Sequence, residues 1–335
     1  MKRPLVSILI PFKNTSEFLS ECLQSIIDQE YPHWEVLGVD DHSTDKSLEL
    51  VTLYSKIDPR IRVFQGNGNG IIEALRLAYA RSNGELITRM DSDDIMAPIK
   101  LQTMVDALAK KGKGHLAVGQ VTYFSKNGVG DGYRRYEHWL NQLTKKGENF
   151  SEIYKECVIP SPCWMVYRED LETCNAFRPN QYPEDYDLAF RFREAGLKTI
   201  SCDKVLHFWR DYDTRTSRTS EHYAQNYFLD IKLHHFLKLD YDPQRPLVIW
   251  GAGKKGKSIA KGLIDKGIFF EWICDNPNKI GKSIYGIPMK AFKFLDGIEN
   301  PQSIITVANG HEQASIRTYL ANLHLRPMVD YFFFC

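Results

Sequence analysis

The stretch Glu85-Leu-Ile-Thr-Arg-Met-Asp-Ser-Asp-Asp94 joins a short β-rich run to a cluster of carboxylates. Three earlier runs of the same kind cover Leu5–Ile10, Trp34–Val39 and Ile61–Phe64. Apolar residues at helical spacing separate the runs, over 18–27 and again over 72–79. Short strands that alternate with helices are typical of βαβ units around a parallel sheet. The sequence therefore predicts an open α/β sheet.

Polar residues follow three of these runs at the point where each one ends. They are Pro11-Phe-Lys-Asn14, Asp40-Asp41 and Asp91-Ser-Asp-Asp94. Ligands of open α/β sheets bind outside the carboxyl ends of the strands. We therefore expect these side chains to form the functional site.

The pattern Asp91-Ser-Asp93 has two explanations on the residues alone. A nucleotide diphosphate and its metal need oxygen ligands, and this spacing lets two carboxylates reach a divalent cation and a neighbouring ribose. Asp and Ser also favour helix caps, here before a helix expected over Met96–Leu108. Both explanations stay open at this point.

Four motifs in this order and at these separations resemble those of the large family-2 glycosyltransferases with the GT-A fold. They are Ser7-Ile-Leu-Ile-Pro-Phe-Lys-Asn14, Val39-Asp-Asp-His-Ser-Thr-Asp45, Asp91-Ser-Asp-Asp94 and Glu184-Asp185. The resemblance covers residues 4–220 and implies a Rossmann-like mixed sheet flanked by helices. It also implies an inverting transfer from a nucleotide-sugar, most often a UDP-sugar in this family.

The resemblance also implies roles for individual residues in donor binding. Pro11 would shape the turn under the donor nucleotide, with Asn14 beside it, while Asp40 or Asp41 would take the edge of the base and Asp91 the ribose. Asp93 would hold Mg²⁺ or Mn²⁺ against the diphosphate. This sequence departs from the family pattern at His42, where many members have glycine, for which a left-handed turn is less costly.

Inverting transfer to a hydroxyl requires a carboxylate that takes the acceptor's proton. Asp185, in Pro183-Glu-Asp-Tyr186, matches the position of the family's catalytic base, and Asp187 and Glu184 are the other candidates. The alternative is that acidic residues merely favour the first turn of a helix. That preference explains the position of the cluster but not three carboxylates directly after a proline.

The basic run from His207 to Arg218 also has two interpretations. Arg210, Arg215 and Arg218 would clamp the donor diphosphate, because arginine suits bidentate contacts with oxyanions. His207 would add a nitrogen ligand to the metal, as a histidine near this position does in some GT-A enzymes. The alternative is a solvated loop in which nearby aspartates pair with the arginines and His207 is an ordinary surface residue.

A second α/β module is expected after the proline-containing linker at 240–246. Leu247–Trp250 is followed by Gly251-Ala-Gly253-Lys-Lys-Gly256, and an acidic residue, Asp275, stands 22 positions after Gly253. Strand, G-x-G-x-x-G and helix in this order favour a Rossmann-like fold. NAD or another nucleotide would bind these residues if the motif is functional, whereas glycines that serve only turning and packing would bind nothing.

Composition limits the remaining classes of function. The 335 residues carry 43 Lys and Arg against 42 Asp and Glu, which argues against a nucleic-acid partner. Seven scattered cysteines, without C-x-x-C, indicate a reducing compartment without structural zinc. The apolar run near the N-terminus is too short for a signal peptide or a membrane span. We expect a cytoplasmic protein, located at the inner face of the membrane if its acceptor is there.

The sequence predicts a catalytic domain over 1–240 and an accessory domain over 246–335. The expected activity is a metal-dependent, inverting transfer of one hexosyl or N-acetylhexosaminyl group to a glycan or lipid-linked acceptor. The Q-x-x-R-W segment of processive family members is absent, which favours single-sugar transfer. The alternatives are a dinucleotide-dependent oxidoreductase that uses the C-terminal glycine motif, and a non-catalytic nucleotide- or carbohydrate-binding protein.

Overall fold

A computed structural model describes residues 3–215, 218 and 228–335 of the chain. It divides into two units, one of Met1–Phe150 and Val158–Tyr223, the other of Ser151–Cys157 and Ala224–Cys335. The sequence analysis placed one domain boundary between residues 240 and 246, and the structure divides the chain differently. The short segment 151–157 and the residues just before 240 belong with the C-terminal unit.

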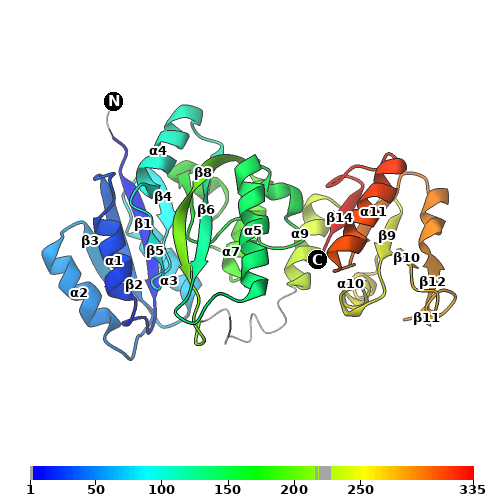
Figure 1. Cartoon of the computed structure of the whole chain (residues 1–335), viewed down its shortest axis with the longest axis horizontal. Coiled ribbons are helices and arrows are strands. Elements are labelled where there is room, and N and C mark those ends of the chain that lie inside the picture. The colour runs from blue at the N-terminus through cyan, green and yellow to red at the C-terminus, as the bar shows by residue number, and fades with distance from the viewer. Residues whose placement is uncertain (1–2, 216–217, 219–227) are drawn as a thin grey trace. The chain divides into compact units, whose positions relative to one another are not determined.

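An eight-stranded sheet forms the centre of the first unit (Figure 1). Its strands, in spatial order, are β3 (Ile61–Gln65), β2 (Trp34–Asp40), β1 (Val6–Phe12), β4 (Leu86–Arg89), β7 (Trp164–Tyr167), β6 (His115–Phe124), β8 (Lys198–Arg210) and β5 (Ile95–Met96). β1 to β4 run parallel, while β7 and β5 are antiparallel to their neighbours. β1 and β2 are buried along their whole length, as expected for central strands covered on both faces.

Helices cover this sheet and connect its strands. They are α1 (Leu19–Ile27), α2 (Ser47–Ile57), α3 (Ile71–Ala80), α4 (Lys100–Lys111), α5 (Asp131–Lys146), α6 (Arg168–Thr173) and α7 (Glu184–Glu194). α3 packs on β1 and β2, whereas α5 lies along β6 and β8 (Figure 1). Within the described residues, no helix combines the length and the apolar character needed to cross a bilayer.

The strand register brings the predicted motifs to one edge of the sheet. Phe12 lies level with Asp40 in the β1–β2 pair, and Leu9 lies level with Arg89 in the β1–β4 pair. The segments that follow β1, β2 and β4 therefore leave the sheet at the same carboxyl edge. The GT-A type fold expected from the motifs is confirmed by this mixed, helix-covered sheet.

One local expectation differs from the structure. The helix expected over 96–108 begins only at Lys100, because Ile95 and Met96 pair with β8 as strand β5. The acidic turn before it therefore does not cap a helix. The sequence analysis gave no element for the residues around Tyr133, which form helix α5.

The second unit contains a six-stranded sheet in the order β11 (Ser283–Ile284), β12 (Ile287–Ala291), β10 (Glu271–Cys274), β9 (Leu247–Trp250), β13 (Gln302–Ile305) and β14 (Tyr331–Phe333). All pairs are parallel except β11–β12. Helices α9 (Leu229–Leu239), α10 (Lys254–Ile264) and α11 (Gly310–Asn322) and the 3-10 turn Phe292–Gly297 accompany it. From β12 to β14 the strand order reverses at β9, as in doubly wound nucleotide-binding folds.

Candidate functional site

The acidic turn Asp91–Asp94 is held from several sides. The backbone N–H of Asp94 donates to the carbonyl of Asp91 at 3.2 Å, which closes the turn. The hydroxyls of Thr15 and Ser92 lie 3.0 Å apart, so the segment after β1 contacts the turn after β4. The two predicted motifs are thus neighbours in space.

Strand β8 fixes the far end of this turn through Asp94. His207 Nε2 lies 2.9 Å from Asp94 Oδ2, and both side chains are fully buried. The backbone N–H of Arg210 donates to Asp94 Oδ1 at 2.7 Å. Burial lowers the pKa of His207 well below its usual value, which favours a neutral ring. His207 is therefore neither a surface residue nor exposed to the edge of the sheet.

Arg210 directs its guanidinium to the acidic turn. Its Nε donates to the carbonyl of Asp93 at 2.7 Å, another nitrogen contacts Glu21, and the group lies over the ring of Phe18 at 4.7 Å. The side chain is 8% exposed. These contacts position the turn, and a direct contact with the donor diphosphate stays a prediction.

Asp91 and Asp93 are the members of the turn with half-buried rather than buried side chains. The hydroxyl of Tyr212 donates to Asp93 Oδ2 at 2.9 Å. Burial, followed by the charge of Asp94, raises the pKa of Asp93 to about 7. Three clustered carboxylates make this position strongly attractive to a cation.

Arg89, which no motif singled out, connects the acidic turn to the predicted base. It is the last residue of β4, and its guanidinium contacts Asp91 at 2.9 Å and Glu184 at 2.8 Å. All three side chains are at most 18% exposed. The neighbouring negative charges, Asp91 first, raise the pKa of Arg89 despite its burial. No local sequence pattern reveals this role, because Glu184 is 95 residues away in the chain.

The first turn of α7 carries the three candidate carboxylates in different surroundings. Glu184 pairs with Arg89, and Asp187 pairs with Arg191 at 2.7 Å. Asp185 accepts the N–H of Tyr186 at 2.8 Å and forms no ion pair within the part of the chain that the structure describes. Burial and then the charge of Glu184 raise the pKa of Asp185 to about 7, a value suited to a general base.

The predicted nucleotide-binding residues gather at the ends of β1 and β2. Asp40 is buried and accepts the N–H of Ser43, so it shapes the turn after β2. Asn14 Oδ1 accepts the N–H of Thr44 at 2.7 Å, joining the two turns. Pro11 lies inside β1, opposite Val39, rather than in the turn itself.

Asp41 contacts two groups that the sequence analysis did not name. Its carboxylate accepts the N–H of Gly70 at 3.1 Å and lies 3.4 Å from Lys13 Nζ. Gly70, at φ 94°, is the residue before α3, and a Cβ there would lie 2.9 Å from the hydroxyl of Tyr182. The turn at His42 is left-handed, with φ 58°, which is the strained conformation that a glycine would adopt more easily.

The remaining basic residues lie beside an aromatic group. Arg215 lies over the ring of Trp209 at 5.5 Å, and its charge opposes the raised pKa values of Asp93 and Asp94. Arg218 pairs with Asp211 at 2.7 Å, as the solvated-loop alternative described. Residues 216–217, with Ser217, and residues 219–227 lie outside the described part of the chain.

The carboxylates of the acidic turn are the kind of oxygen ligand that a protein supplies to a hard divalent cation. No group of three ligating side chains occurs within the residues that the structure describes. Mg²⁺ is often bound by one or two carboxylates, with substrate phosphates and water completing the set. Asp93, half-buried beside Asp91, has the right chemistry for such a ligand. Of the two ring nitrogens of His207, Nε2 is taken by Asp94, and the buried Nδ1 has no hydrogen-bond partner among the described residues.

The glycine motif of the second unit has the geometry of a tight strand-to-helix turn. A Cβ on Gly256 would lie 2.1 Å from the carbonyl oxygen of Gly251, so packing requires this glycine. A Cβ on Gly253, before α10, would meet no atom within 4 Å. Asp275 accepts the indole N–H of Trp250 at 3.2 Å. Packing therefore requires glycine at positions 251 and 256, whereas no contact requires a glycine at position 253.

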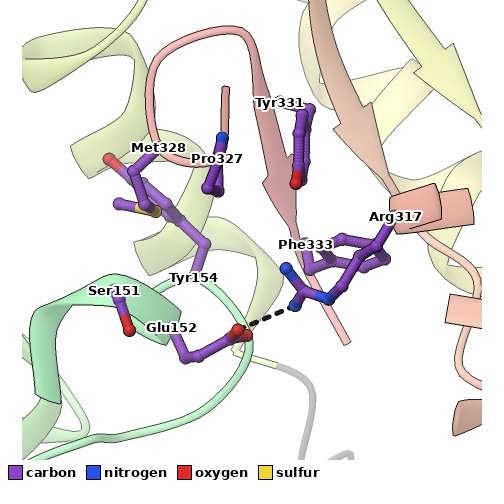
Figure 2. A pocket seen from close by; sticks show the side chains of 8 residues that line it. All are labelled: Ser151, Glu152, Tyr154, Arg317, Pro327, Met328, Tyr331 and Phe333. Atoms are coloured by element: carbon purple, nitrogen blue, oxygen red, sulfur yellow. Dashed lines mark hydrogen bonds and ion pairs between the residues drawn. The ribbon is translucent and has the colours of Figure 1, made fainter. Parts of the chain in front are cut away.

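A small pocket lies elsewhere in the second unit (Figure 2). Arg317 and Glu152 face one another across it and pair at 2.7 Å, and the guanidinium lies over the ring of Phe333 at 4.1 Å. The other lining residues are Ser151, Tyr154, Pro327, Met328 and Tyr331. Its two charged side chains neutralise one another, so the pocket offers little to a polar ligand.

A mixed sheet with an acidic turn at its carboxyl edge, joined through Arg89 to a cluster of carboxylates on α7, is the arrangement expected of a GT-A type glycosyltransferase. The sequence model described as glycosyl transferase family 2 matches residues 7–174. The chain therefore belongs to glycosyl transferase family 2. The prediction of a family 2 glycosyltransferase is confirmed, while the roles of the individual motif residues stay predictions.

Named relatives and a solved structure agree with this family. An uncharacterized glycosyltransferase from Haemophilus influenzae is 30% identical over 228 residues, 65% of this chain and 69% of that protein. The chondroitin synthase of Pasteurella multocida is 35% identical over 215 residues, 61% of this chain but 21% of the synthase. The chain also spans less than half of two further matching glycosyltransferases, from Bacillus subtilis and Streptococcus pneumoniae.

The crystal structure of S. aureus TarS 1-349 in complex with UDP-GlcNAc shares the fold. It has a TM-score of 0.54 at 17% identity and covers 78% of this chain and 72% of that one. At this identity the likeness concerns the fold alone. None of these comparisons supports the NAD-dependent alternative.

Proposed function

We propose that this protein transfers one sugar from a nucleotide-sugar, a UDP-sugar in the first instance, to a hydroxyl of a glycan or lipid-linked acceptor with inversion. The observation that carries the proposal is the bridge from Asp91 through Arg89 to Glu184, next to Asp185. It joins a donor-binding turn and a candidate base through one buried arginine. Such a pairing of donor site and base is what an inverting transferase needs.

Asp185 is the proposed general base. Its carboxylate would accept the proton of the acceptor hydroxyl as the oxygen attacks the anomeric carbon and the nucleotide diphosphate leaves from the opposite face. Glu184 and Asp187 are engaged in ion pairs with Arg89 and Arg191. The bond between sugar and diphosphate breaks as the new glycosidic bond forms.

Asp93 and its neighbours are proposed to bind the diphosphate end of the donor. A divalent cation bound there would neutralise the charge that develops on the leaving diphosphate. Arg210 keeps the turn in place. Its backbone N–H donates to Asp94 and its Nε donates to the carbonyl of Asp93. Asp91 would contact the ribose, and Asp40 or Asp41 the base.

Two comparisons support a UDP-sugar donor and a saccharide acceptor. TarS, which shares the fold, is described in complex with UDP-GlcNAc. The relative from Pasteurella is described as a chondroitin synthase, which points to polysaccharide biosynthesis. Transfer of one sugar rather than a polymer rests on the missing Q-x-x-R-W segment.

The experiment is a nucleotide-diphosphate release assay on the full chain. UDP-GlcNAc, UDP-glucose, UDP-galactose and GDP-mannose are each incubated with Mn²⁺, with Mg²⁺ or with a chelator, in the presence of oligosaccharide acceptors. We expect metal-dependent release with one donor and, by NMR, a product of inverted anomeric configuration. Retained configuration, or release that the chelator leaves unchanged, would contradict the proposed mechanism.

A further inference from the structure

Helix α10 of the second unit presents a stripe of lysines to solvent. Lys254, Lys257 and Lys261 are three and four residues apart, so they share one face of the helix, and all three are exposed. The buried residues of this helix, Gly256, Ile259, Ala260 and Leu263, lie on the opposite face. Among the described residues, none of these three lysines has an ion-pair partner.

Two exposed apolar side chains follow these lysines in the sequence. Ile264, the last residue of α10, follows Lys261 by three residues on the same face and is 40% exposed. Phe269, in the segment after the helix, is 82% exposed, although its neighbour Phe270 is buried. Asp265 and Lys266, also exposed, offset one another in charge. The lysine face of α10 is thus followed closely in the chain by an exposed phenyl ring.

We propose that this face of α10, with Ile264 and Phe269, docks on a membrane surface that contains anionic lipids. Lysines near such a surface gain about 1 kcal/mol each from the negative potential, and an apolar side chain at the headgroup level adds to the attraction. The C-terminal part from residue 246 carries 11 basic and 7 acidic residues, so its net charge has the complementary sign. The inference does not depend on the proposed transfer reaction.

The two exposed apolar side chains distinguish a membrane from other anionic partners. A nucleic acid or a soluble polyanion would be attracted by the lysines but would gain little from Phe269. A bilayer gains from both, because the aromatic ring can enter the region between headgroups and acyl chains. Binding that depends both on the lysines and on Phe269 therefore indicates a membrane as the partner.

The test is sedimentation of the full chain with vesicles of phosphatidylcholine alone or with one quarter phosphatidylglycerol. We compare the parent with Lys254→Gln/Lys257→Gln/Lys261→Gln and with Phe269→Ser. The matched control is Lys56→Gln/Lys110→Gln/Lys111→Gln, which removes three exposed lysines from the first unit. Thermal shift with the donor nucleotide, measured in parallel, reports on the first unit separately.

We expect binding only to the anionic vesicles. The α10 triple variant should lose about 100-fold in affinity, which corresponds to about fivefold per lysine. Phe269→Ser should weaken binding as well, while the control triple binds like the parent. Equal binding of the parent to both vesicles, or an α10 variant that binds like the control, would overturn the proposal. So would lysine-dependent binding to heparin together with vesicle binding that is insensitive to Phe269→Ser.

Discussion

The guanidinium of Arg89 lies 2.8 Å from the carboxylate of Glu184, across 95 residues of sequence. The same guanidinium contacts Asp91 at 2.9 Å. Strand β4, which ends at the acidic turn, is thereby joined to the start of α7, which carries Asp185. One side chain thus links the acidic turn to the helix that carries the proposed base.

Replacing Arg89 should destabilise the protein and reduce its activity together. Arg89→Met leaves two buried carboxylates without their cation, and we expect the free energy of unfolding to fall by about 3 kcal/mol. Urea denaturation at neutral pH measures this loss. Lys113→Met, which breaks an exposed pair with Glu169, is the control and should change stability little. Equal effects of the two variants would contradict the role given to Arg89.

Asp185→Asn should separate binding from chemistry. We expect transfer to fall by about 10²-fold or more, because general base catalysis contributes that much. Donor affinity, measured by calorimetry, should stay unchanged. Near-normal transfer by Asp185→Asn would move the base to Asp187 or Glu184, whose asparagine and glutamine variants are made in parallel.

The rate of transfer should depend on the ionisation of Asp185. Its pKa is raised to about 7, and a general base acts only when deprotonated. The turnover rate at saturating metal and donor should therefore rise with pH up to about 7 and level off above it. Donor affinity, followed over the same range, tests whether Asp93 contributes to the profile. A turnover rate that stays flat from pH 5.5 to 8 would contradict this assignment.

Asp93→Ala should abolish metal-stimulated turnover. The variant removes the half-buried carboxylate of the turn while Asp94 still holds His207 and Arg210. Binding of Mn²⁺ in the presence of UDP, followed by electron paramagnetic resonance, should weaken in parallel. Tyr212→Phe removes only the hydrogen bond to Asp93 and should retain metal binding. Unchanged metal dependence in Asp93→Ala would exclude this ligand.

Two glycines of the second unit should respond differently to substitution. Gly256→Ala places a Cβ against the carbonyl of Gly251 and should lower stability by about 2 kcal/mol or more. Gly253→Ala enters open space and should leave stability nearly unchanged. Calorimetry of NAD and UDP with Gly253→Ala and with the parent tests whether the motif binds a nucleotide. A heat of binding that Gly253→Ala abolishes would support an accessory site.

The sequence predicts the elements around the site well, because central parallel strands and their polar ends leave clear patterns. The runs at 5–10, 34–39, 61–64 and 85–90 correspond to β1, β2, β3 and β4. The sequence analysis missed α5, although Tyr133, Tyr136, Leu140 and Leu143 keep the spacing of one helix face. This helix packs on β6 and β8.

Individual side-chain roles were harder to predict than elements. His207 and Arg210 stand in a basic, polar run that resembles a loop, yet both lie in β8 and contact Asp94. Nothing in the local spacing shows that residues 94 and 207 meet. Arg89 escaped notice for the same reason, since its partner Glu184 is distant in sequence.

The segment Ser151–Cys157 belongs to the C-terminal unit although residues of the first unit precede and follow it. Its Tyr154 stacks on Phe334 at 5.1 Å and meets Phe236 edge-on at 5.9 Å. An exchange of the tail after residue 240 would keep Phe236 but replace Phe334, and would leave Tyr154 without its stacking partner. Substitutions in the tail are therefore constrained by seven residues in the middle of the chain.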